Sequence, residues 1–303
     1  MASGTAAKAK QYNSKQGNAW RRELNELIRG ACGGFLFGIP LLYTMEVWWI
    51  GSFTEPPMML AAIAIAFVAV FLLNRTAGFR RIQNVKFIDA FKDTVEALAI
   101  GFVCATIILT LLQEITPEVS LHEALGKVLF EGIPFSLGVA VANLFLQGAN
   151  SEDESGEADA QPQGQSNQED LINATLADVG ATLIGASIIA ANIAPTDEVP
   201  MLAAASSAAW LLALIGVSLL ISYGVVFQAN FANQKRRLKQ QGLFQRPMSE
   251  TVMSYLVSLL ISAFLLWFFQ QLGFDDPWSM WLRYTLILGL PATVGGAAGR
   301  LAI

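Results

Sequence analysis

The sequence predicts an all-α polytopic membrane protein with eight transmembrane helices, arranged as two parallel four-helix repeats. Three observations lead to this prediction: an apolar composition, eight apolar runs long enough to cross a bilayer, and a segment that occurs twice. Of the 303 residues, 54% are hydrophobic and only 14% are charged, whereas soluble domains carry about 25% charged residues. The lipid bilayer is therefore the first expected partner of this chain.

The apolar runs define the expected spans. A hydrocarbon core about 30 Å thick needs about 20 apolar residues per helix. Eight runs meet this measure, at residues 28–50, 57–74, 90–113, 123–147, 170–193, 200–228, 249–272 and 279–301. The second run is short, and the sixth is long enough to be tilted or broken.

Lysine and arginine residues set the expected orientation, because positively charged loops stay on the cytoplasmic side of a membrane. With eight spans, the basic clusters before the first span, after the second and after the sixth all fall on one side. The opposite connections are mainly acidic. Both termini are therefore predicted to be cytoplasmic, with residues 1–27 forming a cytoplasmic N-terminal segment.

An acidic segment separates the two expected halves, residues 28–147 and 170–303. Ser151 to Asp170 contains seven acidic residues and no bulky apolar residue. Such a segment cannot bury enough apolar surface to offset the entropy of ordering. Residues 148–169 are therefore predicted to be a disordered cytoplasmic linker.

The internal repeat is clearest in the last two helices of each half. Asp93 to Asn143 aligns with Glu250 to Arg300 at a constant shift of 157 residues, with ten identities. The sharpest match pairs GIPFSLG, residues 132–138, with GLPATVG, residues 289–295. A unit with an even number of spans enters the membrane twice from the same side, so the repeat is expected to be parallel.

The first two helices of each half match more weakly. Residues 59–62 and 201–204 share the sequence MLAA at a shift of 142, and Gly33 matches Gly180 at a shift of 147. Different shifts would correspond to small insertions in the loops.

Buried carboxylates are the candidate pathway residues. Glu131 lies inside an apolar run, where an ionisable group costs on the order of 3 kcal/mol. Because burial disfavours the charged form, Glu131 is a candidate carrier of a proton or cation. A protonated Glu131 hydrogen-bonded to another helix explains the residue equally well. Asp178 is the second candidate, followed by Glu96 and by Glu46, which lies near the outer interface.

Three prolines are candidates for helix breaks: Pro134, Pro291 and Pro40. A proline inside a helix removes one backbone donor and frees the carbonyl four residues earlier. At Pro134 and Pro291 these are the carbonyls of Phe130 and Ile287. A freed carbonyl must find a neighbouring helix, water or a bound cation. Proline kinks are also common in membrane helices that bind no ligand.

Several functions have no support in the sequence. The only cysteines, Cys32 and Cys104, lie in apolar runs and indicate neither a disulfide framework nor a metal site. No hydrolase, nucleotide-binding or dinucleotide-binding motif is present. The chain is therefore not expected to be an enzyme, to hold a metal or cofactor, or to bind nucleic acid.

The segment ELIRGACGGFLFGIPLLYTMEVWW, residues 26–49, together with KDTVEAL and GIPFSLG, resembles a family of bacterial integral membrane proteins. The family is known from cyanobacteria and proteobacteria, and its function is unknown. The resemblance implies a bacterial inner membrane location and gives no activity or site residues.

The tandem repeat, the expected helix breaks and the isolated carboxylates favour a transporter or channel for a small ion or solute. Its path would run through the interface between the halves. The alternative is a scaffold or assembly factor that binds a partner through its cytoplasmic segments. An intramembrane enzyme acting on lipids would need a second polar group near Glu131 or Asp178. The sequence is compatible with a homo-oligomer.

Overall fold

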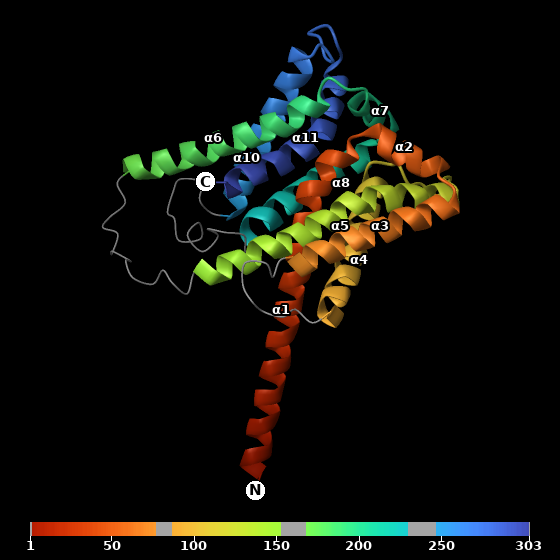
Figure 1. The fold of residues 1–303 in the computed structure, drawn as a ribbon. Helices are drawn as coiled ribbons and strands as arrows, with labels where there is room; N and C mark the ends of the chain where they lie inside the picture. The colour runs from red at the N-terminus through yellow and green to blue at the C-terminus, as the bar shows by residue number, and fades with distance from the viewer. Residues whose placement is uncertain (1, 77–86, 153–167, 230–246, 303) are drawn as a thin grey trace.

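The computed structural model describes residues 2–76, 87–152, 168–229 and 247–302, and these residues form helices joined by short connections. The elements, shown in Figure 1, are α1 (Ala2–Leu42), α2 (Met45–Phe53), α3 (Pro56–Thr76), α4 (Phe87–Leu111), α5 (Leu121–Glu152), α6 (Gln168–Ile193), α7 (Glu198–Ala205), α8 (Ala208–Tyr223), the π-helical η2 (Gly224–Gln228), α10 (Pro247–Phe268) and α11 (Trp278–Leu301).

Six helical segments in the described ranges are long and apolar enough to cross a membrane. They lie in α3, α4, α5, α6, α8 with η2, and α10. A seventh span results if the membrane part of α1 and the short α2 are counted together. The chain is thus an all-α polytopic membrane protein with six or seven candidate spans.

Helix α11 is the expected span that this criterion does not include. It carries Arg283 and Arg300 and several glycines, which lower its mean hydropathy. Every residue from Leu286 to Ala297 is nevertheless buried by other helices. Over this stretch α11 therefore contacts protein on all sides.

Two expected spans are wrong in detail. The predicted span 28–50 ends at Leu42, where the chain bends by 87° into α2. The predicted span 200–228 is divided at Ser206 and Ser207 into α7 and α8. Tyr43 and Thr44 leave the helical backbone path between α1 and the short α2. Ser206 and Ser207 do the same between the short α7 and α8.

The expected linker at residues 148–169 lies only partly within the described residues. Helix α5 continues to Glu152 and α6 begins at Gln168, so both ends of the linker are helical. Residues 153–167 lie outside the described residues.

Two helix pairs cross at glycines. Helix α1 packs along α5, and α6 packs along α11 (Figure 1). A Cβ atom added at Gly33 of α1 would lie 2.7 Å from the carbonyl oxygen of Gly138 on α5. A Cβ atom added at Gly185 of α6 would overlap the carbonyl of Gly295 on α11. Only glycine lets the two backbones of each pair approach so closely.

Helices α4 and α10 end in the same way. Gln113 and Gln270 have φ angles of 65° and 62°, and they are the only residues other than glycine with positive φ in the described chain. After each glutamine, the next backbone N–H donates to a leucine carbonyl five residues earlier at 2.9 Å. This left-handed residue satisfies carbonyls that a helix C-terminus otherwise leaves without donors.

One apolar core extends across the molecule. It includes Ile39 and Leu109 from the N-terminal helices and Leu266 and Ile287 from the C-terminal helices. A smaller cluster, around Val70, lies between α3, α4 and α5. The N-terminal and C-terminal helices are therefore packed together as one body and not as two separate cores.

Candidate functional site

Glu131 lies on α5 in the interior of the protein. Its side chain is 0% exposed, and neither carboxyl oxygen has a hydrogen-bond partner among the described residues. Buried side-chain polar atoms nearly always have a partner. A buried charge without one is strongly unfavourable, so burial favours the neutral, protonated carboxyl at this position.

Lys127 is the cation nearest to Glu131 along α5, one helical turn earlier, and it is engaged elsewhere. Its Nζ atom lies 3.2 Å from Glu114 Oε2 and 3.0 Å from Glu123 Oε1. It also lies 5.6 Å from the centre of the Trp48 ring. Burial raises the pKa of the Glu114 carboxyl, and the ammonium of Lys127 acts in the opposite direction. Lys127 thus holds the connection before α5 in place and does not neutralise Glu131.

The prolines do not break α5 or α11. Both helices continue through Pro134 and Pro291. The sharp change of direction instead follows Pro40, where α1 ends two residues later. No interruption is therefore seen at Pro134 or Pro291 in the described helices.

Tyr43 provides a donor for a carbonyl that one of these prolines frees. Its hydroxyl donates a 2.7 Å hydrogen bond to the carbonyl oxygen of Ile287, the carbonyl that Pro291 leaves without its usual donor. Both groups are buried. The freed carbonyl thus finds its partner in the chain that follows α1, and this bond joins the N-terminal to the C-terminal helices.

A double-mutant cycle tests this assignment. Tyr43→Phe leaves the Ile287 carbonyl buried without its donor, so it is expected to lower the free energy of unfolding by about 1–3 kcal/mol. In a Pro291→Ala background the new backbone N–H can donate to Ile287, so the same change is expected to cost less. Thermal unfolding in detergent measures all four proteins. Equal costs of Tyr43→Phe in both backgrounds would contradict the assignment.

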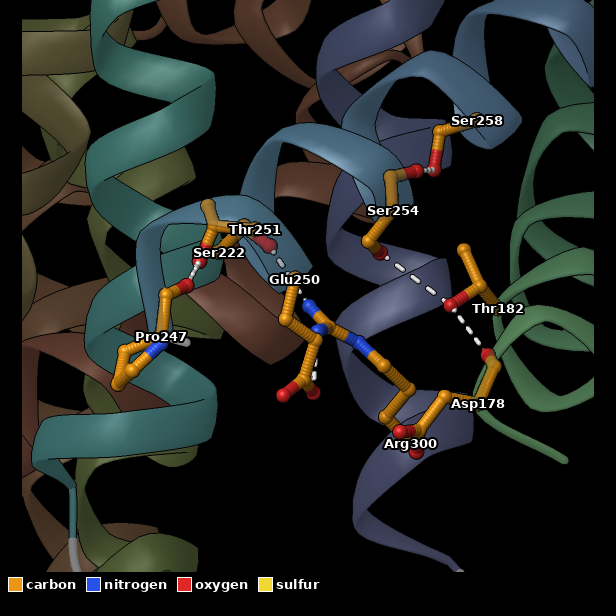
Figure 2. A network of polar contacts seen from close by, with 9 residues as sticks. All are labelled: Asp178, Thr182, Ser222, Pro247, Glu250, Thr251, Ser254, Ser258 and Arg300. Carbon is orange, nitrogen blue, oxygen red and sulfur yellow. Dashed lines mark hydrogen bonds and ion pairs between the residues drawn. The ribbon is translucent and has the colours of Figure 1, made fainter. Parts of the chain in front are cut away.

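Asp178 lies in a buried polar network between α6, α10 and α11 (Figure 2). Its side chain is 6% exposed. Its backbone carbonyl accepts a 2.8 Å hydrogen bond from Thr182, and the Thr182 hydroxyl lies 3.2 Å from the Ser254 hydroxyl of α10. Glu131 belongs to α5, and the described structure shows no contact between the two carboxylates.

Arg300 is the centre of this network and was not predicted from the sequence. It is 0% exposed. Its Nη1 lies 3.1 Å from Glu250 Oε1, and its Nη2 donates to the Ser222 hydroxyl at 2.9 Å. Figure 2 shows the guanidinium reaching from α11 toward α10 and α8. The arginine therefore connects three helices inside the protein.

A sequence signal for this network does exist. Ser254, Ser258 and Ser262 recur every four residues on α10, which places them on one helix face, and all are fully buried. Glu250 precedes them by one turn on the same face. An acidic residue at the start of a serine-lined face predicts a buried cationic partner, and Arg300 is the only basic residue in the last turn of the neighbouring α11.

The other two carboxylate candidates lie at the surface. Glu96 on α4 and Glu46 on α2 are both exposed. A different carboxylate, Glu198 in the first turn of α7, is buried, and its Oε1 accepts a 3.2 Å hydrogen bond from the backbone N–H of Met45. Glu198 thereby supplies an acceptor to the start of α2, where helix N–H groups lack partners.

The comparison with known families gives one result. A family model described as "Putative integral membrane protein (DUF2391)" matches residues 26–303. The chain belongs to the DUF2391 family. No curated protein and no solved structure is significantly similar to it. The family description gives the protein its place in a membrane and assigns it no activity.

The DUF2391 match covers Glu131, Asp178 and the Arg300 network. In the described part of this DUF2391 chain, no three His, Cys, Asp or Glu side chains lie together as ligands for a metal would. The side chains described at these sites are carboxyl groups, hydroxyl groups and a buried guanidinium, which can bind protons, form hydrogen bonds and form ion pairs.

Proposed function

We propose that this DUF2391 protein moves a small ion or solute across a bacterial inner membrane, and that Glu131 binds and releases a proton during the cycle. The main support is the fully buried carboxyl of Glu131, which has no hydrogen-bond partner among the described residues. A group that stabilises nothing in the structure yet is costly to bury is a candidate for function. The proposal involves no covalent chemistry, so the protein is not proposed to be an enzyme.

The position of Glu131 in the proposed repeat supports this. The residue at the corresponding position of α11 is Leu288, which is also fully buried. An apolar side chain therefore fits this place in the fold, and packing alone does not require a carboxyl group at position 131.

The helix bounds support the proposal of eight crossings in two parallel halves. The segment Pro56–Thr76 corresponds to residues 208–228 at a shift of 152, and α5 and α11 begin 157 residues apart. The left-handed Gln113 and Gln270 are a repeated pair. The short helices α2 and α7 follow the first long helix of each half.

The same comparison favours a single shift of 152 for the first two helices of each half over the shifts of 142 and 147 proposed from sequence. At this shift Gly33 aligns with Gly185, the two glycines at the close helix crossings. The shift also pairs the segment TMEV, residues 44–47, with TDEV, residues 196–199. Glu46 and Glu198 then occupy equivalent positions.

Contacts between the halves support the view that this structure is a closed conformation. Tyr43 donates to Ile287, and Met45 donates to Glu198, where the first half meets the second. Arg29 of α1 donates to the carbonyl of Ala229 at 3.1 Å. In the proposed cycle the halves separate, which gives water access to Glu131 from one side at a time.

Flux measurements in proteoliposomes test this function. Under an imposed pH gradient and with several cations, the intact protein is expected to carry ions, and Glu131→Gln is expected to abolish proton-coupled flux, because an amide keeps the shape but cannot release a proton. Glu118→Gln, at an exposed carboxylate in the connection before α5, is the matched control and should retain flux. Equal flux through the intact protein and Glu131→Gln would show that Glu131 does not carry the proton.

The second candidate function is a scaffold or assembly factor that binds a partner through its cytoplasmic segments. The continuous apolar core between the halves favours it. A scaffold can be rigid, whereas a transporter needs an ion path through the protein. Absence of flux for every ion tested, with folded protein in the liposomes, would support this candidate over transport.

A further inference from the structure

Helix α8, which forms the second crossing of the proposed second half, ends in a π-helical turn. The segment η2 covers Gly224–Gln228, and its residues from Gly224 to Phe227 are buried. The N–H of Ala229 donates to the Gly224 carbonyl at 2.9 Å, which is the i to i+5 bond of a π-helix. Single π-turns are less stable than α-helix and occur frequently at functional sites.

Two arginines from different halves hold the two ends of η2. Arg300 of α11 donates to the hydroxyl of Ser222, which stands two residues before η2. Arg29 of α1 donates to the carbonyl of Ala229, which directly follows η2. Hydrogen bonds from charged donors are stronger than neutral ones. The π-helical turn is therefore fixed between the first and the second half.

Helix α1 also packs directly on the backbone of η2. A Cβ atom placed at Gly224 would lie 3.0 Å from the sulfur of Cys32. Cys32 is buried, and η2 packs against α1 and α11. No side chain separates the α1 face at Cys32 from the η2 backbone at Gly224, so this is a place of close contact between the halves.

We infer that η2 and the arginines at its ends form a closure between the halves, at the end of the bundle that carries Arg29 and Arg300. The inference rests on the proposed function, in which the halves separate. Conversion of the π-turn into α-helix would rotate the residues on one side of it by about 100° relative to the other. Such a rotation cannot preserve both arginine contacts. Opening would therefore release the contacts of Arg29 and Arg300 together and expose the α1 face at Cys32.

A disulfide between α1 and η2 tests the closure. In a Cys104→Ala background, Gly224→Cys places a second thiol beside native Cys32, within the range that an S–S bond of about 2.05 Å can close. Oxidation is expected to link Cys32 to the new thiol and to stop flux in proteoliposomes, and reduction is expected to restore it. Gly216→Cys on α8, where a Cβ would meet open space, is the matched control and should form no such link.

A second readout does not depend on transport. Water-soluble maleimide should label Cys32 slowly in the Cys104→Ala protein and about tenfold faster after Arg29→Gln, which corresponds to about 1.4 kcal/mol in the opening equilibrium. Arg75→Gln, at an exposed residue of α3, should leave the rate unchanged. The labelling of Ser136→Cys, a buried position of α5, should not change after Arg29→Gln.

The outcomes separate the two proposals. Full oxidation with unchanged flux would overturn the closure and leave transport standing. Faster Cys32 labelling after Arg29→Gln, in a protein that carries no ion, would support a moving closure and remove the transport function. Failure of Cys32 and the residue 224 thiol to link in folded protein, together with unchanged labelling, would overturn the closure by itself.

Discussion

Gly185→Ala is expected to lower the free energy of unfolding by more than about 2 kcal/mol, because overpacking against backbone cannot be relieved by a rotamer change. The added methyl group would overlap the carbonyl of Gly295 and lie close to Gly299, so α6 and α11 would have to move apart. Gly180 lies earlier on α6 and has no atom of another residue within 4 Å of an added Cβ. Gly180→Ala is expected to be neutral or to stabilise by about 0.5–1 kcal/mol.

Thermal and denaturant unfolding in detergent measures both variants. Gly33→Ala is the corresponding test in the first half, where the added methyl group would lie 2.7 Å from the Gly138 carbonyl. If the two halves pack alike, Gly33→Ala and Gly185→Ala should cause losses of similar size. Equal stability of Gly180→Ala and Gly185→Ala would show that α6 and α11 do not cross at this glycine.

Arg300→Met is expected to lower the free energy of unfolding by about 3–5 kcal/mol, because it takes the guanidinium away from the buried carboxylate of Glu250. Both side chains are buried, at 0% and 6% exposure, so water cannot replace the lost interaction. The Ser222 hydroxyl loses its charged donor at the same time.

The partner variant decides between loss of an ion pair and loss of packing. Glu250→Gln combined with Arg300→Met removes the remaining charge, and the double variant is expected to recover part of the stability. Arg75→Met, at an exposed arginine, should change stability little. If the double variant is as unstable as the sum of the single variants, Arg300 acts through its volume and not through Glu250.

Hydropathy located most helices because it reports the transfer of a helix from water to lipid. It therefore found α3, α4 and α10 within a few residues. It could not detect the bend after Leu42 or the interruption at Ser206, since an apolar run continues through both. It does not select α11, whose residues Leu286 to Ala297 are buried by other helices.

In the proposed repeat, the register of the first two helices of each half depends on which glycines are in contact. In the proposed repeat, the MLAA match at residues 59–62 and 201–204 rests on common membrane residues, whereas Gly33 and Gly185 both lie at close backbone contacts. A contact between two backbones can be recognised in the sequence only by the glycines themselves, because no other side chain takes part in it. The sequence alone could not decide which of several glycines on each helix was the one in contact.

For the candidate site, the depth of Glu131 was predictable from the apolar run around it. The absence of a hydrogen-bond partner for Glu131 was not predictable, because it depends on the pairing of Lys127 with Glu114 in the connection before α5. Arg300 was missed because it stands at the end of its helix, where arginines usually reach the membrane surface. In the structure, Glu250 and Ser222 hold it inside.

Measuring the protonation state of Glu131 tests the central claim most directly. The claim is that the Glu131 carboxyl is neutral in the proposed closed conformation and releases its proton during transport. Infrared spectroscopy of the membrane-embedded protein at neutral pH is expected to show a protonated carboxyl C=O band that shifts in D₂O and is missing in Glu131→Gln. Identical carbonyl spectra for intact protein and Glu131→Gln would mean that Glu131 is charged, and the proposed proton carrier would be wrong.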